Sequence, residues 1–198
     1  MIPYTFILYG CSGSGKGTQA DLLIKYLKKE DPKRKVLYIQ TGQKFRDFVK
    51  LDYYTSKRAE KIINTGQLMP AFLPIWIWTD FLIKNFEEDE HIIFDGLVRR
   101  RDEAPIFDGA MKFYDRKMPY IILLNVSEEW ATKRLTERGR EDDKAEEIRK
   151  RIDWYHTDVI PTIDFFRNNP DYNFLDINGE QTIEEVHKEI VDKLKIKY

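Results

Sequence analysis

The 198-residue sequence lacks the features of disulfide-bonded, zinc-binding, membrane-spanning and nucleic-acid-binding chains. Its single cysteine, Cys11, excludes an internal disulfide framework and a cysteine-based zinc site, and predicts a reducing, cytoplasmic setting. No apolar run approaches the length of a membrane span, and the first residues show no signal-peptide pattern. Lys and Arg number 33 against 34 Asp and Glu, whereas a nucleic-acid-binding chain favours a basic surface. We therefore expect no nucleic-acid partner and no membrane partner.

Repeats, low-complexity tracts and interdomain linkers are also absent, and 198 residues suit one domain with a sizeable core. Short apolar runs alternate with segments of helical periodicity. The runs that predict strands are 5–9, 36–40, 91–94, 120–126 and 173–177. Strands that alternate with helices predict βαβ crossovers, and hence an α/β fold of three layers, α/β/α, around a five-stranded parallel sheet.

A glycine-rich stretch joins the first predicted strand to the first predicted helix. It reads Gly10-Cys11-Ser12-Gly13-Ser14-Gly15-Lys16-Gly17-Thr18. Its glycines let backbone N–H groups approach an anion, and the helix that follows presents its N-terminal N–H groups to the same anion. Lys16 adds a charge that reaches the terminal phosphates of a nucleotide. Strand, loop, lysine and helix together predict the phosphate-binding loop of a P-loop NTPase.

The residue after the lysine departs from the general P-loop pattern, in which a Ser or Thr contacts Mg²⁺. Here Gly17 follows Lys16, and the hydroxyl comes one residue later, at Thr18. Asp95 ends the third predicted strand, and ligands of parallel sheets bind beyond the carboxyl ends of the strands. We expect Asp95 to hold Mg²⁺ through water, Mg²⁺ to accompany ATP, and no structural zinc to be needed.

Arginines form a second group of candidate residues. Four of them fall on a predicted helix–turn–helix corner: Arg134, Arg138, Arg140 and Arg151. Guanidinium groups suit phosphoryl oxygens, so this corner predicts an anion site. Arg46 and Arg99 each follow a different strand, too far along the sheet to serve the same phosphates. They indicate a second phosphate-bearing substrate, as transfer between two phosphates requires.

The alternative for the corner is that its arginines only pair with nearby acids on the surface. Asp142 and Asp143 lie within the charged turn and are expected to orient some of the arginines. Such pairing explains any single arginine, but it does not explain the whole set.

These residues resemble a known family over nearly the whole chain. The stretches GSGKGTQ, TGQKFR, GQLMP, DGLVR, RLTERGR-x-DD, I-x-K-R and NGEQT are similar in order and spacing to the adenylate kinase pattern. The resemblance implies one nucleoside monophosphate kinase domain over 1–198, with a monophosphate-binding insert at about 41–70 and a short lid at about 138–144. The implied reaction is reversible, Mg²⁺-dependent transfer from ATP to AMP giving two ADP, by a cytoplasmic monomer.

The resemblance also implies roles for individual residues. Those that would bind ATP are Gly13, Ser14, Gly15, Lys16, Gly17, Thr18, Arg134, Arg138 and Gln181, with Arg134 stacked on the base. Those that would bind AMP are Thr41, Arg46, Gln67, Leu68, Met69, Gly96, Leu97, Val98, Arg99, Glu103, Arg140 and Arg151. The catalytic group would be Lys16, Asp95, Arg99, Arg138, Arg140 and Arg151.

The predicted acceptor region departs from the family pattern at two positions. Val98 stands where a proline usually precedes the arginine, and we expect a trans peptide with a shifted loop, because a non-proline cis bond costs roughly 2.5–4 kcal/mol. Glu103 stands where a glutamine usually reads adenine. A carboxylate accepts from the adenine amino group but cannot donate to ring N1, and it suits the donors of guanine.

Thr41 favours AMP, since uridylate and cytidylate kinases typically have alanine there, and it is also expected to cap the following helix. The acceptor base therefore stays open, with AMP favoured and UMP, CMP or GMP as alternatives. A non-catalytic nucleotide-binding switch is the alternative of another class. Against a GTPase-type switch, the fourth strand leads into Asn125-Val126-Ser127-Glu128 and lacks the N-K-x-D guanine motif. Against a non-catalytic chain, Lys16, Asp95 and the arginines are all present.

Overall fold

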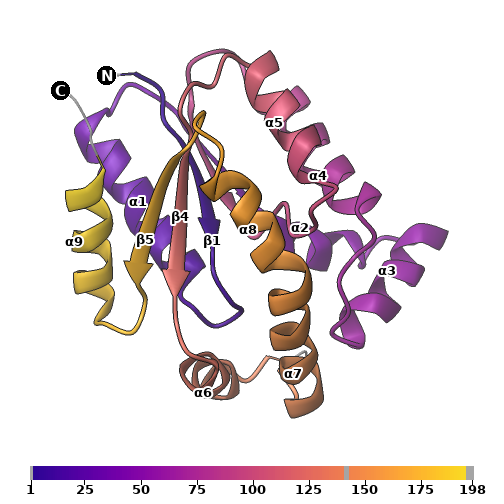
Figure 1. The fold of residues 1–198 in the computed structure, drawn as a ribbon. Coiled ribbons are helices and arrows are strands. Elements are labelled where there is room, and N and C mark those ends of the chain that lie inside the picture. Colours follow the sequence, from indigo (N-terminus) through magenta and orange to yellow (C-terminus); the bar gives the residue numbers. More distant parts are fainter. Residues whose placement is uncertain (1, 141–142, 195–198) are drawn as a thin grey trace.

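The computed structural model describes residues 2–140 and 143–194, and it has the predicted α/β architecture (Figure 1). The predicted lid includes Glu141 and Asp142, which lie outside the described residues. Five parallel strands form one sheet in the order β2-β3-β1-β4-β5. Their bounds are β1 (Thr5–Tyr9), β2 (Val36–Gln40), β3 (His91–Asp95), β4 (Tyr120–Asn125) and β5 (Asn173–Asn178). All five lie within a residue of their predicted ranges.

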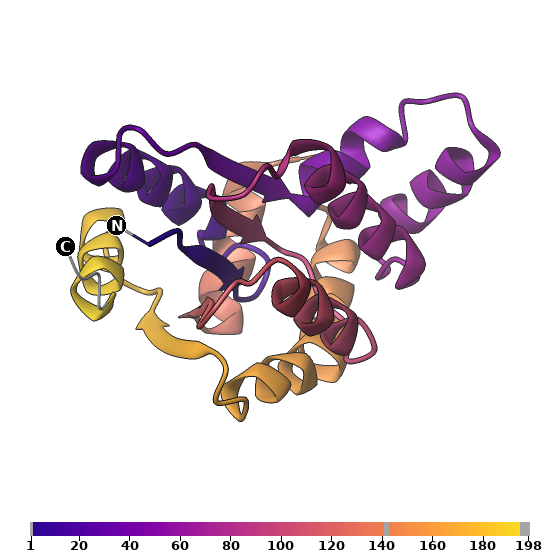
Figure 2. The ribbon, with the colours of Figure 1, turned by 90° about the horizontal axis from the view of Figure 1, so that it is seen from above.

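Alternate residues of the central strands pack into two separate cores, one on each face of the sheet. In β1, Ile7 and Tyr9 belong to one core, while Phe6 and Leu8 belong to the other. Helices α1 (Lys16–Glu30) and α9 (Ile183–Lys193) cover the face of Phe6. Helices α4 (Phe72–Asn85), α5 (Ala104–Phe113) and α8 (Ile160–Arg167) cover the opposite face (Figures 1 and 2). Burial of apolar side chains on both faces explains why β1 and β4 are almost continuously hydrophobic.

The strand register brings three strand ends together at one edge of the sheet. Asp95 in β3 lies opposite Leu8 in β1 and opposite Gln40 in β2. The chain leaves β1 at this edge and enters the glycine-rich loop, and it leaves β2 here directly into α2 (Thr41–Phe48). The sheet therefore places the loop, Asp95 and the start of α2 side by side.

Helix α2 begins differently from our prediction. Gln40 occupies the N-cap position and Thr41 is the first helical residue, with no side-chain cap hydrogen bond. The prediction that Thr41 caps this helix was therefore wrong, because its hydroxyl lies inside the first turn. The Thr41 side chain is buried, and its Oγ1 has no hydrogen-bond partner among the described residues.

Helix α3 (Tyr54–Asn64) and the segments around it project from the sheet and have a small core of their own (Figure 2). That core joins α2, α3, the loop before α4 and the first turns of α4; its buried members are Phe45, Phe48, Ala59, Met69, Leu73 and Ile77. This region shares no buried apolar residue with the two cores of the sheet.

The last third of the chain builds the helical corner and a long helical column. Ser127 caps α6 (Glu128–Arg138) by accepting from the Trp130 N–H at 3.2 Å. After the corner, α7 (Ala145–Trp154) continues through a π-helical turn, η1 (Tyr155–Val159), directly into α8. The irregularity in this column is the π turn, and Pro161 is accommodated in the first turn of α8. Among the described residues, no helix combines the length and apolarity that a bilayer crossing requires.

Candidate active site

An open cavity of about 1510 Å³ lies at the edge of the sheet where β1, β2 and β3 end. Its wall is formed by the glycine-rich loop, the start of α2, the segment 66–69, the segment that follows β3, and the corner between α6 and α7. Every residue for which we predicted a site role lines this cavity, except Ser14 and Gln181. One continuous cavity therefore joins the predicted donor residues to the predicted acceptor residues.

The backbone of the glycine-rich loop is shaped by close approaches that only glycine allows. Gly13 has φ +88°, and a Cβ there would lie 2.7 Å from the carbonyl oxygen of Ala131 in α6. Gly15, with φ +92°, is the N-cap of α1 and carries no side chain to bond the N–H groups of the first turn. These N–H groups and the helix dipole are therefore left for an anion.

Lys16 lies across this loop. Its Nζ donates to the carbonyl oxygens of Gly10 at 2.7 Å and Cys11 at 2.9 Å. Burial lowers the pKa of Lys16, and the nearby Asp95 carboxylate opposes that shift. Ser14 does not line the cavity because its side chain is buried beneath the loop, 3.5 Å from Lys16 Nζ.

Asp95 is buried beside the glycine-rich loop and is held by two residues of β2. Its Oδ2 accepts from the Tyr38 hydroxyl and from Gln40 Nε2, both at 3.1 Å. A Cβ on Gly17 would lie 3.7 Å from the same oxygen, so Asp95 closely faces the start of α1. We did not predict Tyr38 and Gln40; their alternate positions in β2, next to the strand that ends in Asp95, are the signal that would have found them.

The carboxylate of Asp95 fits the predicted role towards Mg²⁺. Mg²⁺ usually keeps several waters and takes one or two carboxylates together with the phosphates of the substrate, so a single acidic wall residue beside a phosphate loop suffices. Within 2–140 and 143–194, no group of three or more His, Cys, Asp or Glu is arranged to hold a metal ion.

Asp143 bonds two of the corner arginines, as we predicted, whereas Asp142, for which we predicted the same, lies outside the described residues. The oxygens of Asp143 accept from Arg138 Nε at 2.8 Å, Arg138 Nη2 at 2.7 Å, Arg151 Nη2 at 2.9 Å and the backbone N–H of Arg140 at 3.2 Å. Burial acts to raise the pKa of Asp143, but the hydrogen bonds from Arg138 and Arg151 outweigh it and lower that pKa. Arg134, one turn earlier, has its guanidinium 5.1 Å from the ring centre of Trp130.

One of the two other predicted arginines is placed differently from our expectation. Arg99 lies close to the P-loop, since it lines a small cavity together with Lys16 and its charge acts to lower the pKa of Lys16. The expectation that Arg99 lies too far along the sheet to serve the same phosphates was therefore wrong. Arg46 donates from Nε and Nη2 to the side-chain oxygen of Gln43. Arg99 donates from Nε to the Gly96 carbonyl oxygen at 2.7 Å, and its guanidinium lies 5.3 Å from the ring centre of Trp154. Trp154 Nε1 in turn donates to the Gly66 carbonyl oxygen at 3.0 Å, which ties α7 to the segment after α3. The role of Trp154 carries no sequence signal that we recognise.

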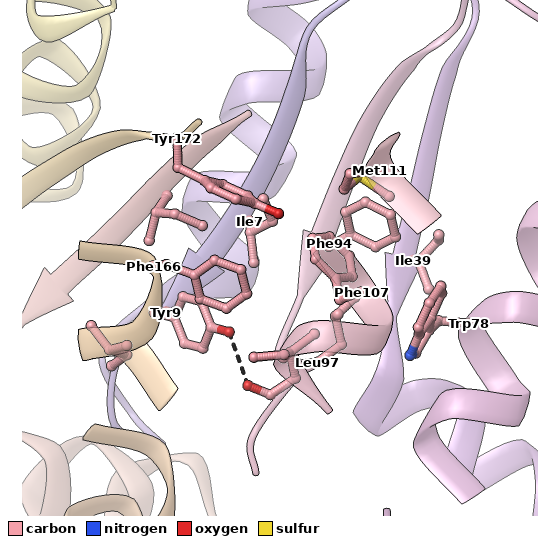
Figure 3. Packing of buried hydrophobic residues seen from close by; sticks show 14 of the residues in the cluster. Ile7, Tyr9, Ile39, Trp78, Phe94, Leu97, Phe107, Met111, Phe166 and Tyr172 are labelled. Atoms are coloured by element: carbon pink, nitrogen blue, oxygen red, sulfur yellow. Dashed lines mark hydrogen bonds between the residues drawn. The ribbon is translucent and has the colours of Figure 1, made fainter. Parts of the chain in front are cut away.

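The expectation of a trans peptide at Val98 is confirmed, while the shifted loop stays a prediction. The described residues contain no cis peptide bond, and Val98 has φ +51°, which is unusual for a β-branched residue. Its carbonyl oxygen accepts from the buried Tyr9 hydroxyl at 2.9 Å (Figure 3). Burial raises the pKa of Tyr9, so the hydroxyl keeps its proton for this bond. The strained loop is therefore held by β1.

Glu103 is nearly inaccessible to solvent, with 1% of its surface exposed, although it lines the cavity. Its Oε1 accepts from the backbone N–H of Arg100 at 3.2 Å, while its Oε2 is buried with no hydrogen-bond partner among the described residues. Burial raises the pKa of Glu103 to about 7. Unlike Asp143, this carboxyl group is therefore close to half protonated at neutral pH.

Gln181 lies outside the cavity, before α9. Its Nε2 donates to the Asn178 carbonyl oxygen at 2.9 Å and to Glu189 at 2.7 Å. The segment is nevertheless next to the P-loop helix, since Gln19 of α1 donates to the carbonyl oxygen of Ile183 at 3.0 Å. The predicted role of the Gln181 backbone stays a prediction.

Comparison with known proteins agrees with the geometry of the site. The sequence model of the family described as "Adenylate kinase" matches residues 8–170. An adenylate kinase of Porphyromonas gingivalis is 34% identical over 197 residues, covering 96% of each chain. An adenylate kinase of Phocaeicola vulgatus is 32% identical over 189 residues, covering 93% of this chain and 95% of its own. This chain belongs to the adenylate kinase family.

Proposed function

We propose that this enzyme transfers a phosphoryl group reversibly from ATP to AMP, with Mg²⁺, to give two ADP. The observation that carries the proposal is one cavity that is lined by the P-loop with Lys16 and also by Arg46 and Arg99. Two anionic substrates bound there would share one cavity, as direct transfer requires. The names of the relatives favour AMP as the acceptor.

The residues divide the work of transfer by position. The N–H groups of the P-loop and Lys16 hold the phosphates of ATP, and Arg46 and Arg99 hold the phosphate of AMP. Arg138, Arg140 and Arg151 neutralise the charge on the group in transfer, which is the main catalytic task of a phosphotransferase. No general base is needed, because the accepting phosphate is already anionic. Mg²⁺, held through water by Asp95, would draw charge from the phosphates of ATP.

Two parts of the chain would close over the substrates. Residues 41–70 pack partly around their own small core, which suits movement as a unit. Residues 138–144 form the short lid, of which 141–142 lie outside the described residues. Closure of both would exclude water, which otherwise competes as phosphoryl acceptor. We propose further that one domain, acting as a monomer in the cytoplasm, contains the whole site.

The test is a coupled assay of ADP formation from ATP and Mg²⁺ with AMP, GMP, CMP or UMP as acceptor. We expect turnover with AMP to exceed turnover with the two pyrimidine nucleotides. GMP is the second candidate, because the Glu103 carboxyl group at the cavity wall suits its donors. Absence of turnover with all four would reject the kinase and leave a nucleotide-binding switch.

A further inference from the structure

Glu103 has one carboxyl oxygen that the protein leaves without a partner. Oε1 is bonded to the backbone of Arg100, but the buried Oε2 has none within the described part of the chain. A buried polar atom without a hydrogen bond is costly, so such atoms in a cavity wall point to a partner that arrives with a ligand. Glu103 lines the cavity that Arg99 also lines, and under the proposed function that ligand is the acceptor nucleotide.

The surroundings of Glu103 suit the flat face and polar edge of a nucleobase. The wall of the same cavity contains the apolar side chains of Leu68, Met69 and Val98. It also contains Thr41, whose Oγ1 is the other wall oxygen that is buried without a partner in the described residues. Apolar walls with a few unpaired polar atoms are the usual composition of a site that orients a small planar ligand.

Charged and titratable groups act on Glu103 from its own segment and from β1. Arg99 favours the ionised carboxylate and Asp102 disfavours it. The Tyr9 hydroxyl faces the group from β1. Asp158 Oδ1 of η1 lies 3.4 Å from Arg100 Nη1, so the negative charge of Asp158 is paired with Arg100. None of these groups forms an ion pair with Glu103 within the 4.0 Å that defines one, so among the described residues both protonation states remain accessible.

We propose that Glu103 reads an adenine acceptor as a neutral carboxylic acid and a guanine acceptor as a carboxylate. The inference rests on the proposed function. A protonated carboxyl group donates from its O–H to adenine N1 and accepts from the adenine amino group, whereas a carboxylate only accepts and matches the N1–H and amino donors of guanine. AMP binding therefore takes a proton from solvent onto Glu103, and GMP binding returns one. The preference for AMP over GMP falls as pH rises.

The direct test is calorimetric titration of the enzyme with AMP alone and with GMP alone, in buffers of different ionisation enthalpy. At pH 7, a group with a pKa of about 7 is half protonated, so AMP should take up about half a proton and GMP should release about half a proton through Glu103. In turnover, the ratio of kcat/KM for AMP to that for GMP should fall about tenfold for each pH unit.

Glu103→Gln is the matched control, since an amide offers one donor and one acceptor edge at every pH. Protons exchanged by the nucleotide phosphate are common to both proteins, so the difference between wild type and variant isolates Glu103. We expect that difference to have opposite signs for AMP and GMP, and the pH dependence of the ratio to vanish in the variant. Equal proton exchange in both proteins, with AMP turnover intact, overturns this inference alone. If neither nucleotide binds or turns over, the proposed function fails as well.

Discussion

The two walls of the cavity treat a buried carboxyl group in opposite ways. Asp143, at the arginine corner, accepts from two guanidinium groups and a backbone N–H, and its pKa is lowered. Glu103, on the acceptor side, accepts from one backbone N–H, and its pKa is raised to about 7. Burial acts in the same direction on both groups, so the donors around each carboxyl group decide its charge. The carboxylate of Asp143 has hydrogen-bond donors from the protein itself, whereas Glu103 has one oxygen with no partner among the described residues.

The largest expected effect is a loss of turnover when the lysine of the P-loop is replaced. Lys16→Met removes the full charge in the P-loop, and we expect kcat to fall about 10³-fold, the scale of losing a main electrostatic contact in a transition state. The coupled assay measures the loss, and urea unfolding checks that the fold persists. Lys25→Met, on the exposed side of the same helix, is the matched control and should keep wild-type turnover. Equal turnover in all three proteins would remove Lys16 from the catalytic group.

The second prediction uses the raised pKa of Glu103. The folded-state pKa of Glu103 exceeds the unfolded value of about 4.5. The contribution of Glu103 to the unfolding free energy is therefore fully present below pH 4.5 and is lost as pH rises through 7. Urea unfolding of wild type and Glu103→Gln should therefore give a difference in unfolding free energy that changes by about 3 kcal/mol across this window. Glu90, which is buried and accepts from the N–H groups of Glu87 and Glu88, has a lowered pKa, so Glu90→Gln should give the opposite slope.

The third prediction concerns the carboxylate of Asp143, whose hydrogen bonds all come from the protein. Asp143→Asn leaves Arg138 and Arg151 without their shared carboxylate, and we expect a loss of about 2 kcal/mol in unfolding free energy together with lower kcat. The pKa of Asp143 is lowered in the fold, so its contribution is present at neutral pH and disappears as pH falls below about 4. Asp176→Asn, which breaks the ion pair with Arg167, is the control that should leave kcat unchanged. Equal kcat in both variants would show that the pairing is structural only.

The smallest expected effect concerns the strained acceptor loop. Tyr9→Phe removes the hydrogen bond to the Val98 carbonyl oxygen and should lower the unfolding free energy by about 1 kcal/mol. If the bond positions Arg99, KM for AMP should rise while KM for ATP stays constant. Tyr172→Phe, which removes a hydroxyl bonded to Asp108 from the same core, should cost similar stability without changing KM for AMP. Parallel changes of both KM values in Tyr9→Phe would contradict a local role.

The P-loop could be predicted from the sequence because the loop, its strand and its helix are neighbours in the chain. The predicted donor roles of Ser14 and Gln181, which do not line the cavity, stay predictions. The sheet was also predictable, since each strand is a short apolar run between polar turns. The acceptor side depends on contacts between distant segments. Tyr9 supports Val98 and Trp154 supports Gly66, and no local pattern specifies either pair. The helix start at Thr41 was missed for a related reason, because the strand before it continues into the helix without a loop.

Lys16 also affects the free-energy cost of binding a nucleotide at the donor site. Its ammonium group bonds to the Gly10 and Cys11 carbonyl oxygens of its own loop, so the loop keeps its shape before any phosphate arrives. Nucleotide entry then exchanges hydrogen-bond partners and does not have to order a segment of chain. The entropy cost of ordering this loop is therefore met within the free protein and does not weaken nucleotide binding.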